Sequence, residues 1–264
     1  MTRTGIPITR LRSLAAMLRQ FGARAPLRGR CPVCGRRAMF VNISPLVRES
    51  FKCPWCRAIL RNRHLALILC RELGVDPHHG LAHLAQVHPD LAIYETQSRG
   101  PIHRFLSRLP QYECSEFLPR TPRGTIAADG TRCEDLQCLT FPDAMFDVVV
   151  SQDVFEHIRD LPAAWREVHR VLTPGGRHVF TVPYFRDRLT RRRIAVDGDR
   201  EIDLLPREYH RDSVRDGLVY TEFGGDLPAL LAEYGFVTSE WCAGEEERRR
   251  WGIYDSCILV SRKR

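Results

Sequence analysis

The pattern of hydrophobic and polar residues is clearest in the middle of the chain, where its period changes twice. The run Phe-Asp-Val-Val-Val at 146–150 is β-branched and follows a Pro-Asp turn, which predicts a buried strand. Residues 153–172 carry apolar side chains at helical spacing, and Pro162 favours a short first piece followed by a second one. A Pro-Gly-Gly turn at 174–176 ends the helix, and residues 178–183 predict the next strand. These elements predict a β-α-β crossover, the unit of a parallel sheet with helices on its faces.

Patterns on either side of the crossover predict further elements. Residues 60–73 carry leucines and an isoleucine on one side and end at Gly74, which predicts a helix. Residues 112–116 predict a second core strand, and residues 227–234 predict a last helix. Between them, the arginine-rich residues 186–215 predict a polar inserted loop.

Four short motifs stand in register across the crossover: Phe146-Asp147, Glu156-His157, Arg170-Val171-Leu172 and Pro174-Gly175-Gly176. A lone Pro-Gly-Gly turn would also suit an unrelated α/β protein. Together, however, the motifs resemble the type 11 branch of the class I S-adenosylmethionine-dependent methyltransferases. The resemblance implies an α/β fold with a doubly wound, seven-stranded Rossmann-like sheet, closed by an antiparallel strand around residues 256–261. It also implies methyl transfer with S-adenosyl-L-methionine as cofactor.

Length and charge narrow the picture only slightly. The 264 residues suffice for one α/β domain with an appendage, and 44% hydrophobic with 27% charged residues is an ordinary globular composition. The net charge of +8 comes almost entirely from arginine, which favours anionic partners but is also explained by an arginine-rich overall composition. The chain has no apolar run of the ~18–20 residues that a membrane span needs. Residues 1–30 lack a signal-peptide core, so we expect a cytoplasmic protein, with a short amphipathic helix at 11–18 docked on its body.

Four of the ten cysteines form two Cys-x-x-Cys pairs, Cys31 with Cys34 and Cys53 with Cys56. Two such pairs at this separation are typical of a zinc ribbon, in which four thiolates complete a closed, structural Zn²⁺ site. Disulfides are the alternative, but the absence of a signal peptide disfavours them, and a redox motif would not occur twice at ribbon spacing. The other six are predicted to be buried or half-buried free thiols: Cys70, Cys114, Cys133, Cys138, Cys242 and Cys257.

These patterns predict four parts along the chain. They are a basic leader at 1–30, a zinc ribbon at 31–60 with short strands at 39–41 and 50–52, a helical linker region at 61–91, and a methyltransferase domain at 92–264 with a lid insertion at about 185–225.

The resemblance also implies where the cofactor would bind. The family follows its first strand with an acidic residue and a glycine-rich loop, whereas the matching segment here has Glu95 and a single glycine, Gly100. Glu116, at the end of the second strand, would accept hydrogen bonds from both ribose hydroxyls, because a carboxylate has two acceptor oxygens. A surface glutamate is the alternative. The remaining contacts would come from Asp135 to the adenine amine, Leu136 to the adenine ring, and Ser151 and Gln152 at the end of the third core strand.

The catalytic residues are marked less clearly. Methyl transfer depends mainly on alignment, and an oxygen nucleophile also benefits from a base. The candidates are His157 at the mouth of the site, Tyr184 just after the strand that ends at Pro183, and His210 in the inserted loop. A packing or helix-cap histidine and a solvated loop are the structural alternatives.

Three functions follow. The leading one is methyl transfer to a small-molecule or glycan-type acceptor, an anionic one included. An RNA methyltransferase is the second, with the ribbon and the arginines on the phosphates. Two observations disfavour RNA as the substrate. The predicted metal site consists of cysteines alone, and Asp153 to Glu156 occupy the place where an Asn-Pro-Pro-Tyr type motif would be expected. The third is a non-catalytic zinc-containing binding protein with a degenerate cofactor site.

Overall fold

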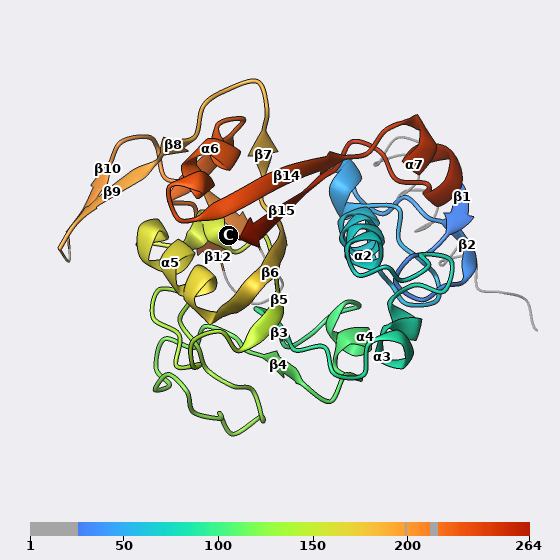
Figure 1. The fold of residues 1–264 in the computed structure, drawn as a ribbon. Helices are drawn as coiled ribbons and strands as arrows, with labels where there is room; N and C mark the ends of the chain where they lie inside the picture. Colours follow the sequence, from blue (N-terminus) through green and yellow to red (C-terminus); the bar gives the residue numbers. More distant parts are fainter. Residues whose placement is uncertain (1–25, 199, 212–215) are drawn as a thin grey trace, which may run out of the picture.

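The computed structural model describes residues 26–198, 200–211 and 216–264 (Figure 1). The helix expected at 11–18 lies outside the described residues. Within the described part, no helix is both long and apolar enough to cross a membrane.

A mixed six-stranded sheet forms the centre of the described chain, in the order β14-β15-β6-β5-β3-β4. Its strands are β3 (Ile93–Glu95), β4 (Tyr112–Cys114), β5 (Phe146–Gln152), β6 (Leu172–Thr181), β14 (Phe236–Cys242) and β15 (Cys257–Lys263). The first four are parallel, β15 runs antiparallel to its neighbour β6, and β14 pairs antiparallel with β15 and so runs in the same direction as the first four. The interior position of β5 and the antiparallel strand expected around residues 256–261 are therefore confirmed, although β15 lies inside the sheet and β14 forms its edge.

The expected seventh strand is not confirmed among the described residues. Beyond β4, the described residues make two isolated bridges, a parallel one between Glu116 and Cys133 and an antiparallel one between Ile126 and Arg132. The predicted mixed α/β architecture with a central sheet is present. Next to β4, where a further strand would pair, the only parallel pairing among the described residues is the bridge between Glu116 and Cys133.

The side chains of β5 alternate between the two faces of the sheet, and both faces are covered by other parts of the chain. Val148 and Val150 of β5 pack into one hydrophobic cluster with the N-terminal part of the chain. Val149, between them, packs into a second cluster with the helices α5 (Leu161–Val171) and α6 (Leu227–Ala232). Figure 1 shows α2 (Leu60–Glu72) on one side of the sheet and α5 on the other, the arrangement of a doubly wound fold.

The crossover between β5 and β6 confirms the predicted two-piece helix. A short 3₁₀ turn, η3 (Phe155–His157), precedes α5, and Asp160 caps α5 by accepting a hydrogen bond from the Ala163 amide at 3.0 Å. Pro162 stands in the first turn, where its missing N–H costs nothing. Strand β6 begins directly after α5, and the turn at 174–176 lies within it, with Gly175 at φ +75°.

The N-terminal unit is a ribbon of short strands. β1 (Leu27–Arg30) pairs antiparallel with β2 (Arg37–Phe40), and a single bridge joins Val41 to Lys52. The predicted strand at 50–52 is therefore reduced to one bridge, and β2 takes its partner from residues that we had expected in the leader. Short helical turns complete this half of the chain: η1 (Val47–Glu49), η2 (Leu81–His83), α3 (Leu84–Val87) and α4 (His103–Leu106).

A buried arginine ties the ribbon to the end of the chain. The guanidinium of Arg63, on α2, lies 3.5 Å from the ring centre of Phe40 and donates to the carbonyls of Trp251 at 2.6 Å and Gly252 at 3.0 Å. Trp251 ends α7 (Glu245–Trp251), and a Cβ at Gly29 would lie 2.9 Å from its carbonyl carbon. The ribbon, α2 and α7 therefore share one core with the sheet.

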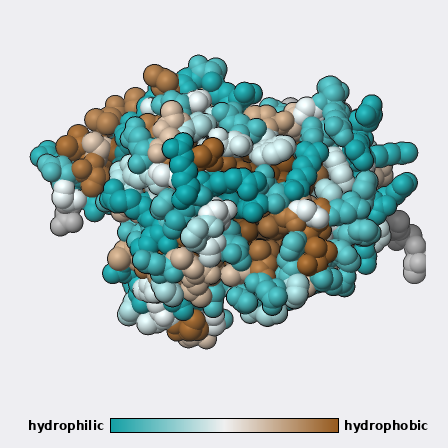
Figure 2. All heavy atoms as spheres, viewed as in Figure 1, coloured by the Kyte–Doolittle hydropathy of each residue, from teal (hydrophilic) through white to brown (hydrophobic). Residues whose placement is uncertain are grey.

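The arginine-rich segment is not a plain loop in its described residues. It contains β8 (Arg191–Arg192), β9 (Ile194–Asp197), β10 (Arg200–Asp203) and β11 (Tyr209–Arg211), and it is flanked by β7 (Tyr184–Phe185) before it and by β12 (Asp216–Leu218) and β13 (Thr221–Gly224) after it. Arg191 and Arg193 form ion pairs with Glu222, a partner that the local pattern does not reveal. Figure 2 shows hydrophobic residues at the end of the molecule where Figure 1 has the β9–β10 hairpin, and Ile202 and Leu204 are exposed there.

Two of the six cysteines expected as free thiols are bonded to each other. Cys242 and Cys257 form a disulfide with their Cα atoms 4.0 Å apart. They stand directly opposite each other on β14 and β15, and this antiparallel pairing brings them together. Cys138 is exposed rather than buried.

Candidate active site

A large cleft of about 1790 Å³ opens at the carboxyl ends of the parallel strands. Segments following β3, β4, β5 and β6 line it, as ligand sites in open α/β sheets require. Two further parts of the chain close its sides. Leu46 to Glu49 and Arg61 come from the N-terminal unit, and Tyr209, His210 and Gly217 come from the β11–β12 hairpin.

Glu116 lines this cleft directly after β4. One of its oxygens, Oε1, accepts hydrogen bonds from the Ser98 amide at 2.9 Å and the Ser98 hydroxyl at 3.0 Å. The other oxygen makes no hydrogen bond with the described residues. Glu116 therefore orders the loop after β3 and keeps one oxygen available to a ligand.

Glu95 and Gly100 do not line the cleft. The Glu95 side chain is fully buried, accepts a hydrogen bond from the Tyr112 hydroxyl at 2.8 Å, and has its pKa raised to about 8 by burial. Gly100 has a φ of +103°, and a Cβ there would meet no atom within 4 Å. It serves the turn geometry, not a close approach of other atoms to the backbone.

The remaining candidates for cofactor contacts differ in whether they face the cleft. Asp135, Leu136 and Gln152 line the cleft, whereas Ser151 is buried and hydrogen-bonded to His178 at 2.8 Å. Asp135 accepts the Gln137 amide at 2.9 Å. The amide of Gln152 bridges two parts of the chain, because it accepts from Asn62 at 2.7 Å and donates to Gln97 at 2.9 Å.

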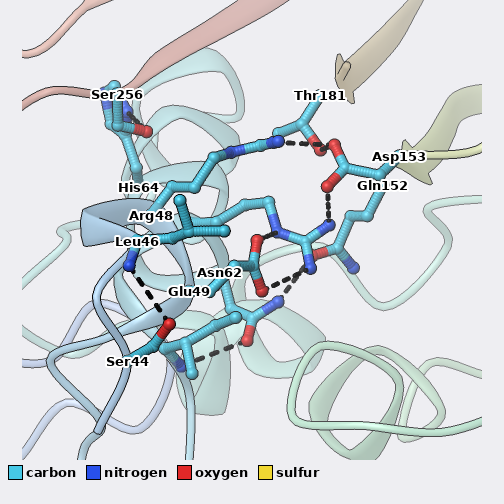
Figure 3. A network of polar contacts seen from close by, with 12 residues as sticks. Ser44, Leu46, Arg48, Glu49, Asn62, His64, Gln152, Asp153, Thr181 and Ser256 are labelled. Carbon is cyan, nitrogen blue, oxygen red and sulfur yellow. Dashed lines mark hydrogen bonds and ion pairs between the residues drawn. The ribbon is translucent and has the colours of Figure 1, made fainter. Parts of the chain in front are cut away.

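Asp153, next to Gln152, holds an ion-pair network that sequence reasoning missed (Figure 3). Arg48 donates to it at 2.7 Å and Arg61 at 2.5 Å, and the Thr181 hydroxyl donates at 2.9 Å. Burial alone would raise the pKa of Asp153, but the charges of Arg61 and Arg48 outweigh burial and lower it. The N-terminal unit thus reaches the carboxyl end of β5 with two guanidinium groups.

The catalytic candidates His157, Tyr184 and His210 all line the cleft. The rings of His157 and His210 meet edge to face with their centres 5.3 Å apart, although the residues are far apart in sequence. Burial is the main cause that raises the pKa of Tyr184. Glu156 contacts both histidines. It belongs to the Glu156-His157 motif but was not among the catalytic candidates predicted from the sequence.

The four cysteines of the ribbon gather at one point. The Sγ atoms of Cys31 and Cys56 are 3.6 Å apart, those of Cys34 and Cys53 are 4.0 Å apart, and all four lie within 4.8 Å of one another. A hydrogen bond from Cys31 is the main cause that lowers the pKa of Cys34 to about 7. Four converging sulfurs fit a tetrahedral Zn²⁺ site with no open position.

Comparison with known proteins adds a family match. Residues 115–180 match the model of a family described as a methyltransferase domain. This stretch runs from just after β4 almost to the end of β6, and it contains the cleft-lining segments that follow β4 and β5.

Two curated relatives and one solved structure illustrate the similarity. The chain is 37% identical over 102 residues to a glycine/sarcosine/dimethylglycine N-methyltransferase of Actinopolyspora halophila, covering 38% of this chain and 18% of that protein. It is 30% identical over 132 residues to an uncharacterized methyltransferase of Schizosaccharomyces pombe, covering 43% and 41%. An S-adenosylmethionine-dependent methyltransferase from Mesorhizobium loti is 20% identical with a TM-score of 0.40, covering 66% and 91% of the two chains.

The matches cover only part of the proteins compared. The chain spans less than half the length of both curated relatives, and the TM-score reflects a loose superposition. The matched domain and the methyltransferase relatives support a methyltransferase, and the match covers the cleft residues that follow β4 and β5.

Proposed function

We propose that this protein transfers a methyl group from S-adenosyl-L-methionine to a small-molecule or glycan-type acceptor. The observation that carries the proposal is the agreement between the family match and the cleft. The matched residues 115–180 include Glu116, Asp135, Leu136 and Gln152, and all four line the same cavity at the strand ends. A scaffold that only bound a protein partner would not require this combination.

The residues present suit the proposed cofactor. The free oxygen of Glu116 and the one that it shares with Ser98 would accept from the ribose hydroxyls. Asp135 would accept from the adenine amine and Leu136 would cover the ring. When bound, S-adenosyl-L-methionine supplies a methyl group on a positively charged sulfur, which a nucleophile attacks in line. The chain's own part is to align the acceptor and keep it in place.

Several residues that line the cleft carry guanidinium or phenol groups, which favours a hydroxylated or charged acceptor. Arg48, Arg159 and Arg186 line the cleft together with Tyr184 and Tyr220. Their guanidinium and phenol groups bind hydroxyl, carboxylate and phosphate oxygens. Their presence in the same cleft as the proposed cofactor residues supports an acceptor of the glycan or small polar type.

We also propose one structural Zn²⁺ on Cys31, Cys34, Cys53 and Cys56. The supporting observation is the convergence of four sulfurs within 4.8 Å inside a core that the ribbon shares with the sheet. The ion would hold the ribbon in the conformation that places Arg48 and Arg61 at Asp153.

A calorimetric titration tests the cofactor assignment. Full-length protein is titrated with S-adenosyl-L-methionine, and formation of S-adenosylhomocysteine is then followed with pools of sugars, small hydroxylated compounds and RNA as acceptors. We expect saturable binding and turnover with a small polar pool. Absence of binding at millimolar cofactor would refute the enzyme assignment, and turnover with RNA alone would replace the acceptor class.

A further inference from the structure

Three side chains that offer metal-binding atoms meet inside the cleft. Glu156 and His157 come from η3 and His210 comes from β11, and their ligand atoms lie within 4.8 Å of one another. The Oε1 atom of Glu156 is 3.7 Å from Nε2 of His157 and 3.7 Å from Nδ1 of His210. Ligand atoms around one tetrahedral ion with bonds of about 2.1 Å are roughly 3.4 Å apart, so a small inward movement would bring these three to an ion.

Each histidine turns its other ring nitrogen toward an acceptor. The Nδ1 atom of His157 is 2.9 Å from the Leu218 carbonyl oxygen and must donate to it, which leaves Nε2 unprotonated in the neutral ring. The Nε2 atom of His210 lies 3.6 Å from a carboxylate oxygen of Glu208. Outward contacts to a carbonyl and a carboxylate are the usual support of metal-binding histidines, because they fix the tautomer and the ring orientation.

Glu156 provides a second, independent indication of a ligand. Its side chain is 1% exposed, and neither carboxylate oxygen has a hydrogen-bond partner among the described residues. Its contacts with the two histidines, at 3.7 Å, are longer than hydrogen bonds. A buried carboxylate without partners is costly by several kcal/mol, and a bound cation would remove that cost.

We propose that Glu156, His157 and His210 bind one divalent transition-metal ion that faces the acceptor half of the cleft. Two imidazoles and one carboxylate favour a first-row ion such as Mn²⁺, Fe²⁺ or Zn²⁺ over the oxygen-preferring Mg²⁺ and Ca²⁺. Three protein ligands leave positions open for water or substrate. Asp153 is not a fourth ligand, because Arg48 and Arg61 occupy its two oxygens.

The open positions define the acceptor more narrowly, an extension that rests on the proposed methyl transfer. An ion here would coordinate a hydroxyl oxygen of the acceptor and lower the pKa of that hydroxyl, so that its proton passes to solvent. The oxygen then forms a bond to the methyl carbon. The bond from that carbon to sulfur breaks, and its electron pair stays on sulfur, which releases neutral S-adenosylhomocysteine. The acceptor is thus a hydroxyl compound and the reaction an O-methylation.

The ion would also connect two parts of the chain that are distant in sequence. His210 stands on the β11–β12 hairpin, whereas Glu156 and His157 belong to the turn after β5. A Cβ at Gly217, on β12, would come within 2.9 Å of the His157 ring, so the hairpin already packs closely on the turn. One ion bound by both parts would fix the hairpin over the cleft.

A titration with Mn²⁺ tests the site. Mn²⁺ competes poorly for thiolates, so protein isolated with its ribbon zinc can be titrated directly while electron paramagnetic resonance counts the free Mn²⁺. We expect one Mn²⁺ per chain in the wild type, and at least about tenfold weaker binding in Glu156→Gln and in His210→Ala. His79→Ala, which removes an exposed histidine with a 62% exposed side chain, is the matched control and should bind as the wild type does.

Several outcomes would overturn the proposal. Wild-type protein that binds no Mn²⁺, or a Glu156→Gln variant that binds it as tightly as the wild type, would show that the three groups do not form a metal site. If His210→Ala fails to fold, Glu208→Gln serves instead, since loss of the outer partner should weaken binding by about 10- to 100-fold. Calorimetry with S-adenosyl-L-methionine on the same samples separates the two proposals. Cofactor binding without Mn²⁺ binding removes the metal site alone, and Mn²⁺ binding without cofactor binding removes the proposed function.

Discussion

Replacing Glu116 with alanine should weaken S-adenosyl-L-methionine binding by at least about tenfold, which corresponds to ~1.4 kcal/mol. The carboxylate would accept from two ribose hydroxyls, and hydrogen bonds to a charged group contribute roughly 1.5–3 kcal/mol each. Two circumstances reduce this sum. One oxygen already accepts both Ser98 donors, and the side chain is only half buried, so water replaces part of the interaction. The lower end of the range is therefore the expected loss.

The structure also supplies the control for this prediction. Glu116→Ala removes the loop tie to Ser98 together with the proposed ribose contact, so the two effects must be separated. Ser98→Ala deletes the 3.0 Å hydroxyl bond and keeps both the amide bond and the carboxylate. We expect Ser98→Ala to change the dissociation constant less than about threefold, because a net hydrogen bond of this kind contributes only about 0.5–1.5 kcal/mol and the loop keeps its second bond.

Isothermal titration calorimetry of the wild type and three variants decides the matter. Asp135→Ala should cost less than Glu116→Ala, because it removes a single contact with the cofactor. If Glu116→Ala binds as tightly as the wild type, the assignment of the second strand's end to the ribose is wrong. If Ser98→Ala weakens binding as much as Glu116→Ala does, the carboxylate acts by ordering the loop and does not contact the ribose.

Three further predictions concern stability and the metal. Elemental analysis should find about one zinc per chain in the ribbon, and Cys53→Ser should lower both zinc content and melting temperature; metal-free protein that keeps its fold with all four thiols titratable would contradict this. The pKa of Glu95 is raised from 4.5 to about 8, so the folded state binds this proton more tightly, and the stability that the proton contributes is lost as pH rises from 4.5 through 8. Denaturant melts of Glu95→Gln should therefore show a flatter decline over that window than the wild type, and parallel curves would refute the assignment. Arg63→Ala should lower the free energy of unfolding by about 3 kcal/mol or more, because it leaves the buried carbonyls of Trp251 and Gly252 without a donor and removes the packing on Phe40. A melt within 1 kcal/mol of the wild type, on the order of a single exposed hydrogen bond, would show that the guanidinium is dispensable.

Elements that depend on neighbouring residues could be predicted. The strand at 146–150, the helical piece that starts near Pro162, and the helix predicted at 60–73 follow from local periodicity and from local turn chemistry. The two Cys-x-x-Cys pairs belong to the same category, because each pair forms its own tight turn, and the hydrogen bond from the Gly35 amide to the Cys31 carbonyl is one such local contact. In these places the residues that decide the structure are within a few positions of one another.

The parts that could not be predicted involve residues far apart in the chain. Arg48 reaches Asp153 across 105 positions and Arg61 reaches it across 92, and neither arginine differs locally from the many others in the chain. The same holds for the disulfide between Cys242 and Cys257, which depends on the register of β14 against β15. A register shift of one residue would point the two side chains to opposite faces.

The sequence by itself determined the crossover at the centre of the sheet, the two pairs of ribbon cysteines and several of the residues that line the cleft. Only the tertiary structure decided that Glu95 turns into the core while Glu116 faces the cleft, and that His210 comes to lie beside Glu156 and His157. The physical reason is that parallel strands gather their carboxyl ends at one edge of the sheet. Only packing of the whole chain brings together residues from the ribbon, from the turn after β5 and from the β11–β12 hairpin at this edge. A local sequence pattern therefore cannot predict these contacts.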